Sequence, residues 1–209
     1  MYYLATQNIH ESAIYIWDLY NRRATRNVED RPVDVSDCTL NFHDDIAVYN
    51  FRWFRNSPHL YCSTSTGDTT LDHSFFSIFM IDQIEKSYRE TLDFELQQDN
   101  ESMRCDSHDS NYKISFKSAD KFHNFIKLPF RVKNFCLSEK NKNQIFATQP
   151  SCKFMFDFNN PKDMKFFRAE KEVSGTNYSD YEVNYNGKNI VVFSGQNTIE
   201  LFDIRKVSS

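Results

Sequence analysis

One short pattern of alternating apolar residues recurs four times along the chain, and each copy ends in aspartate. The copies are IYIWD at Ile14–Asp18, SIFMID at Ser77–Asp82, KFMFD at Lys153–Asp157 and IELFD at Ile199–Asp203. Alternation over this length is typical of a β-strand, and aspartate favours a turn directly after it. The four segments are therefore predicted to be equivalent strands of repeated units.

The chain around the second copy predicts four consecutive strands joined by turns. Ile46–Trp53 is the first strand, although its alternation is imperfect, and Leu60–Thr64 is the second, after a turn at 56–58. Phe75–Ile81 is the third strand, and Ser87–Leu96 is predicted as the fourth. Four strands in this order make one antiparallel meander.

Similar units are predicted on both sides of this meander. The strands of the two later units are Val132–Leu137, Gln144–Thr148, Lys153–Phe158 and Met164–Arg168, then Tyr181–Tyr185, Asn189–Phe193 and Thr198–Asp203. The chain opens with Tyr2–Thr6 and Ile14–Asp18, a second and third strand without a first. Two stretches fit no unit: 97–111 is polar and predicted to be a disordered loop, and Tyr112–Phe130 is either a strand pair or contains a short helix around Ala119–Ile126.

Composition narrows the class of protein. The chain has 209 residues, 40% apolar residues and a net charge of −4, which indicates solubility and no nucleic-acid footprint. Its five cysteines include no CxxC pair, so a disulfide framework or a zinc module is not expected. The sequence contains no secretory signal and no long apolar run, and a cytosolic or nuclear location is therefore expected.

At three places the chain resembles the WD-repeat family of β-propellers. These are Ile14–Leu19, the unit with His43, Gly67-Asp68 and Asp82, and Ile199–Lys206, where Phe202 stands in place of the usual tryptophan. The Gly-His dipeptide that often opens such a repeat is absent. The resemblance implies an all-β fold of four-stranded blades and a role in presenting a rigid surface to other proteins.

The number of units sets a further expectation. We count about three to four blades in a single domain spanning 1–209, whereas propellers close with about four to eight. An open part of a ring exposes sheet edges and apolar surface. The chain is therefore expected to be a fragment of a longer protein, or to be completed by a partner or a second copy. A small non-propeller β fold, such as a sandwich, is the alternative.

Candidate catalytic chemistry is sparse. His43-Asp44-Asp45 is the best polar cluster, and a buried His–Asp hydrogen bond explains it better than a metal or acid–base site. Cys105-Asp106-Ser107-His108-Asp109 holds nucleophile and base residue types, but in a polar run rather than on rigid elements. We expect no catalytic residues, no metal and no cofactor, and an enzyme with a dispersed site is the least favoured hypothesis.

Two binding surfaces remain as hypotheses. Protein partners are expected to contact loop-tip residues His59, Asp68 and His73, and the resemblance adds Arg205, from a Trp-Asp-x-Arg-like ending that docks to ubiquitin-ligase adaptors in some WD-repeat proteins. The alternative is a phosphate-binding module for nucleic acid or anionic lipid on the basic stretch 113–142. It would use Lys117, Lys121, Lys127, Arg131 and Lys133, which are interleaved with phenylalanines. The same interleaving is expected of strands with one face in the core.

Overall fold

The computed structural model describes residues 3–7, 12–19, 38–42, 46–66, 74–87, 111–114, 121–149, 152–168, 181–195 and 197–206. Within these ranges the fold is mostly β, with fifteen strands in four separate sheets. Residues 81–87 are helical, and a 3-10 helix η2 covers Ile204–Lys206. The expected all-β class is confirmed, and none of the four sheets closes on itself.

We number the sheets I to IV in the order in which their first strands occur; β7 returns to sheet I between two strands of sheet II. Sheet I contains β1 (Tyr3–Gln7), β2 (Ala13–Asp18), β3 (Cys38–Asn41) and β7 (Asn111–Lys113). Sheet II contains β4 (Ile46–Trp53), β5 (His59–Thr66), β6 (Ser74–Met80) and β8 (His123–Leu128). Sheet III contains β9 (Asn134–Leu137), β10 (Gln144–Gln149), β11 (Cys152–Asp157) and β12 (Asn160–Phe167). Sheet IV contains β13 (Glu182–Tyr185), β14 (Ile190–Ser194) and β15 (Ile199–Asp203).

The four aspartate-ended segments occupy four different sheets. They form β2, β6, β11 and β15, and the last three are the third strands of sheets II, III and IV. In sheet I, β2 lies between β1 and β3, so it corresponds to a third strand if the first is missing. The prediction that these segments are strands of separate sheets is confirmed, but three details differ from it: β15 is an edge strand among the described strands of sheet IV, sheet I includes a parallel pair, and Asp82 lies in the helix at 81–87.

Two details of the predicted strands are wrong. The second neighbour of β6 is β8 and not Ser87–Leu96; Ser87 ends the helix at 81–87, and 88–96 lies outside the described residues. Strand β3 was not predicted, and it pairs in parallel with β7 at the far side of sheet I. Of the two alternatives for 112–130, the structure has strands, β7 and β8, and the described part of Ala119–Ile126 contains no helix. Sheet IV has three described strands, as predicted. The predicted loop at 97–111 lies outside the described residues except for Asn111, which begins β7.

The imperfect alternation in β4 has a structural cause. Ile46 and Val48 are two residues apart, but the next apolar positions, Phe51 and Trp53, are out of phase with them. The pairing of β4 with β5 shifts register between Val48 and Asn50, which is a β-bulge. The extra residue returns Phe51 and Trp53 to the face that packs on sheet I.

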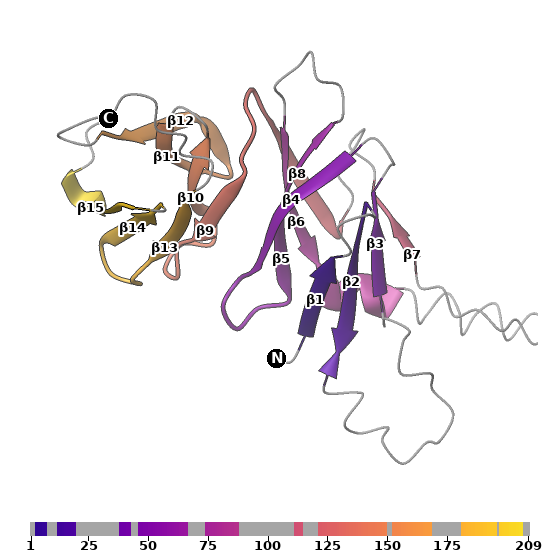
Figure 1. Cartoon of the computed structure of the whole chain (residues 1–209). Coiled ribbons are helices and arrows are strands. Elements are labelled where there is room, and N and C mark those ends of the chain that lie inside the picture. Colours follow the sequence, from indigo (N-terminus) through magenta and orange to yellow (C-terminus); the bar gives the residue numbers. More distant parts are fainter. Residues whose placement is uncertain are drawn as a thin grey trace, which may run out of the picture.

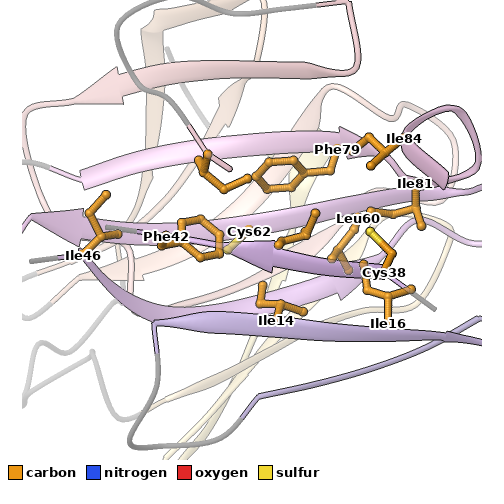
Figure 2. Close-up of a cluster of buried hydrophobic side chains, with 12 residues drawn as sticks. Ile14, Ile16, Cys38, Phe42, Ile46, Leu60, Cys62, Phe79, Ile81 and Ile84 are labelled. Atoms are coloured by element: carbon orange, nitrogen blue, oxygen red, sulfur yellow. The ribbon is translucent and has the colours of Figure 1, made fainter. Parts of the chain in front are cut away.

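The sheets pack face to face in series, I on II, II on III and III on IV (Figure 1). Strand β5 shows how one sheet serves two neighbours, because successive side chains point to opposite faces. Leu60 and Cys62 belong to the core with sheet I, whereas Tyr61 belongs to the core with sheet III. Figure 2 shows Ile14 and Ile16 of sheet I pointing toward this face of sheet II. Each fully buried side chain of this size contributes roughly 1.5–3 kcal/mol.

Sheets II, III and IV approach one another most closely along their first strands. Strand β9 contacts both β4 and β13. The amide of Asn50 donates a hydrogen bond from Nδ2 to Oδ1 of Asn134 at 3.2 Å, which joins β4 to β9. The first strands therefore line one side of the stack, and the later strands extend away from it.

Candidate interaction surface

The turns between the first and second strands of sheets II, III and IV lie on one edge of the stack. They cover residues 54–58, 138–143 and 186–189. The strand pairing places the aspartate end of each third strand on the same edge, since His59 pairs with Met80, Gln144 with Asp157 and Ile190 with Asp203. We call this surface the turn edge.

Contacts between the turns hold the turn edge together from sheet II to sheet IV. Arg55 donates from Nη1 to Oε1 of Glu139 at 2.9 Å, and the Tyr61 hydroxyl donates to the carbonyl of Lys142 at 2.7 Å. Glu139 also reaches sheet IV, because a Cβ on Gly187 would lie 2.5 Å from Oε2 of Glu139. Burial raises the pKa of Tyr61 to about 12, so its hydroxyl stays protonated and remains a donor.

His59 lies on the turn edge, as predicted for a loop-tip residue. Its backbone N–H donates to Oγ of Ser57 at 3.3 Å, and the hydroxyl and Nδ1 are 2.5 Å apart. Burial, and then the charge of Lys142, lowers the pKa of His59, while Asp82 acts in the opposite direction. The lowered pKa favours the neutral imidazole, and the tautomer decides whether Ser57 Oγ or His59 Nδ1 donates in this contact.

The aspartates that end β11 and β15 are turn-forming residues, as the sequence predicted. Oδ1 of Asp157 accepts from the backbone N–H of Asn159 at 2.8 Å, and Oδ1 of Asp203 accepts from that of Arg205 at 3.0 Å. The Arg205 side chain also binds Asp203, with Nε at 2.9 Å from Oδ1 and Nη2 at 2.5 Å from Oδ2. Arg205 is thus on the turn edge and exposed, but its guanidinium is already paired.

The structure places only part of the predicted partner site. His59 and Arg205 lie on the same edge, in sheets II and IV, with sheet III between them. Asp68 and His73 lie outside the described residues. Sequence reasoning did not single out Arg55 and Glu139, which were identifiable only as polar residues in turns between predicted strands, and it included Lys142 only as the end of the basic stretch 113–142.

The described basic residues of the alternative site lie at both ends of sheet II. Lys121 lies beside the start of β8, where Met80 N–H donates to the Phe122 carbonyl at 2.9 Å, close to the turn edge. Lys127 pairs with Phe75 near the other end of β8, about 20 Å away at roughly 3.3 Å per residue. Arg131 and Lys133 follow on that opposite side, and Lys117 lies outside the described residues.

Two of the described cysteines carry thiols whose pKa is raised. Burial raises the pKa of Cys136 to about 12, although Arg52 acts in the opposite direction, and burial raises that of Cys62 well above its usual range. Both thiols are therefore protonated at neutral pH. No group of three metal-ligating side chains occurs within the described ranges. The clusters at 43–45 and 105–109 lie outside them.

A scan of the chain against protein-family models gives no match, and a search of curated proteins gives none either. Among the described residues, no helix has the length and apolar character needed to cross a bilayer.

Proposed function

We propose that this chain is a non-catalytic scaffold for protein–protein assembly, built as part of a WD-repeat-like β-propeller in the cytosol or nucleus. The serial packing of sheets supports this proposal, because propeller blades also pack face to face. The approach of β4, β9 and β13 supports it too, since the first strands of blades surround a common axis. The resemblance of the four aspartate-ended segments to WD repeats points the same way.

The observation that carries the proposal is the continuous turn edge. Three turns from three sheets contact one another in order, through Arg55, Glu139 and Gly187. They present exposed charged side chains, Lys142 and Lys188 among them, on sheets whose inner faces are buried. Loops held by a rigid framework are where binding residues concentrate, so the turn edge is the proposed partner surface.

Two charge-reversal variants of the full chain test this surface. One variant carries Lys142→Glu and Lys188→Glu on the turn edge, and the matched control carries Lys127→Glu and Lys133→Glu near the opposite edge. All four side chains are exposed, and both variants change net charge by the same amount. Each tagged chain is incubated with extract of its source cells, and the retained proteins are quantified by mass spectrometry at low and high salt.

We expect a defined set of proteins on the wild type and on the control, reduced at least about tenfold by the turn-edge variant, or ~1.4 kcal/mol of binding free energy. Equal loss in the two variants, or no protein retained at high salt, contradicts the proposal. Loss only in the control, together with salt-dependent retention of the wild type on heparin or anionic vesicles, supports the phosphate-binding alternative instead.

A further inference from the structure

Positive charge gathers on the turn edge of a chain that carries a net charge of −4. The three turns and the helix η2 hold six exposed basic residues, namely Arg55, Lys140, Lys142, Lys188, Arg205 and Lys206. The acidic residues on the same edge are Glu139, Asp82, Asp157 and Asp203. The edge is therefore positive, opposite in sign to the whole chain.

Ion pairs within the edge engage both arginines and leave the lysines. Arg55 donates to Glu139 at 2.9 Å, and Arg205 binds Asp203. The four lysines, which we call the edge lysines, are Lys140, Lys142, Lys188 and Lys206. In the part of the chain that the structure describes, no carboxylate forms an ion pair with an edge lysine. Their charge is therefore open to a partner.

Hydrogen bonds fix the backbone that carries two of the edge lysines. The carbonyl of Lys142 accepts from the Tyr61 hydroxyl at 2.7 Å. Oδ1 of Asn186 accepts from the backbone N–H of Lys188 at 2.9 Å, and from those of the next two residues at 3.2 and 3.0 Å. A fixed backbone loses less conformational entropy when a partner binds.

The edge lysines of sheets III and IV lie on one continuous surface. A Cβ on Gly187 would lie 2.5 Å from Oε2 of Glu139, so the turn between β13 and β14 lies against the turn between β9 and β10. The N–H of Ile204 donates to the carbonyl of Asn189 at 2.8 Å, which places η2 beside the first of these turns. The basic surface therefore runs from sheet III across the β13–β14 turn to η2.

The same edge is poorly suited to nucleic acid. The rings of Phe54 and Tyr185 are half-buried and that of Phe158 is buried, whereas single-stranded nucleic acid binds by stacking its bases on open rings. Asp157 and Asp203 lie among the lysines, and the net negative charge of the chain repels a long polyanion. A short anionic segment of a protein fits this surface better.

We propose that the partner of the turn edge binds through an acidic segment, rich in aspartate and glutamate, that lies across the edge lysines. The inference rests on the scaffold proposed above, and it names the chemistry of the partner. Stacked sheets lie about 10 Å apart, so an extended segment of about six residues, roughly 20 Å long, reaches across both turns. Several carboxylates have to act together, because each exposed ion pair contributes little.

A labelled peptide of about eight residues, with aspartate and glutamate alternating with serine, tests this chemistry on the full chain. Its binding is measured by fluorescence anisotropy at low and high salt, beside a peptide with asparagine and glutamine in place of the acids. We expect the acidic peptide alone to bind, more weakly at high salt. Lys142→Gln with Lys188→Gln should weaken binding about tenfold. The matched control, Lys127→Gln with Lys133→Gln near the opposite edge, should bind as the wild type does.

The outcomes separate this inference from the scaffold itself. No binding of the acidic peptide at about 1 mM, equal binding of the amide peptide, or equal loss in the control overturns the inference, even where the turn edge retains proteins from extract. Tighter binding of single-stranded DNA or of phosphatidylserine vesicles, lost in the Lys142→Gln and Lys188→Gln variant, also overturns it. Lys142→Arg with Lys188→Arg keeps both charges and should retain binding, and circular dichroism checks that every variant is folded. An extract from which no protein is retained contradicts the scaffold and not the chemistry of the edge.

Discussion

The interface between sheets II and III and the interface between sheets III and IV use one geometry with two kinds of chemistry. The first is aromatic: Phe76 meets Phe135 and Phe156 edge-on, with ring centroids 4.8 and 5.5 Å apart. The second contains a buried ion pair, with Lys153 only 2% exposed and bound to Glu200. The interface between sheets III and IV thus adds a charged contact beside its own apolar core, which includes Phe146 and Phe193.

The difference shows that the fold requires a position in the repeated segment and not one residue type at that position. The distance in sequence from the aspartate determines on which face of the sheet a side chain lies. The facing residue of the neighbouring sheet then determines which residue type is tolerated there. Lys153 is tolerated because Glu200 pairs with it and because its Nζ lies 5.4 Å from the centre of the Phe202 ring. A lysine facing a core is costly without such partners.

The largest effect is expected from Phe76→Ala, which breaks the aromatic interface. Phe76 is fully buried and contacts sheet III by edge-to-face packing. The substitution leaves a cavity between two sheets and should lower the free energy of unfolding by about 3–5 kcal/mol. Urea denaturation measures this loss. Phe166→Ala, on an exposed ring of β12, is the control and should cost far less; equal losses would contradict the described packing.

The next effect is expected from the charged interface. Glu200→Ala leaves the Lys153 charge buried without its carboxylate and should cost about 3 kcal/mol. Lys153→Ile combined with Glu200→Phe installs the Ile–Phe pair that the other two interfaces use, and should restore stability or exceed the wild type by about 1 kcal/mol. At the equivalent positions, those interfaces have Ile14 with Phe79 and Ile78 with Phe154. Thermal and urea unfolding of both variants test this. A double variant as unstable as Glu200→Ala would show that the register is not shared between interfaces.

Much of this fold could be predicted from local pattern. Strands β10 and β14 carry apolar runs between clear turns, and the predicted segments match them closely. The burial of Lys153 against sheet IV could not be predicted, since its partner Glu200 is 47 residues away in the sequence. Strand β8 was missed as the fourth strand of sheet II because its partner β6 ends far earlier in the sequence.

The candidate surface was less predictable than the fold. His59 and Arg205 were each identified from local features, but their common edge depends on how sheets II, III and IV stack. The contact from Arg55 to Glu139 spans 84 residues and follows no local rule. Strand β3 has only four residues and pairs in parallel with β7, so neither alternation nor a hairpin turn marks it.

A smaller effect is expected at the turn between β13 and β14 of sheet IV, which lies against Glu139 of sheet III. Gly187 has a φ of +74°, a conformation that costs other residues about 1–2 kcal/mol. Gly187→Ala should lower stability by that amount and displace the Glu139 carboxylate, which lies where a Cβ would be. Gly187→Asn should cost less, because asparagine adopts this conformation more readily. Urea unfolding compares the two, with Lys188→Ala as the control; an alanine variant as stable as the control would contradict this backbone geometry.

The smallest effect concerns the aspartate that ends sheet IV. The Arg205 side chain, more than its backbone N–H, lowers the pKa of Asp203 to about 2. The folded pKa lies below the ordinary value near 3.8. The contribution of this ion pair to folding stability is therefore fully present above pH 3.8, and it is lost as the pH falls toward 2.

NMR titration of the carboxyl carbon should give a midpoint near 2 in the wild type. Arg205→Ala removes the guanidinium and keeps the backbone donor, so the midpoint should rise only part of the way toward the ordinary value. Lys206→Ala should leave it close to the wild type. An unchanged midpoint in Arg205→Ala would mean that the backbone turn alone lowers the pKa of this carboxyl.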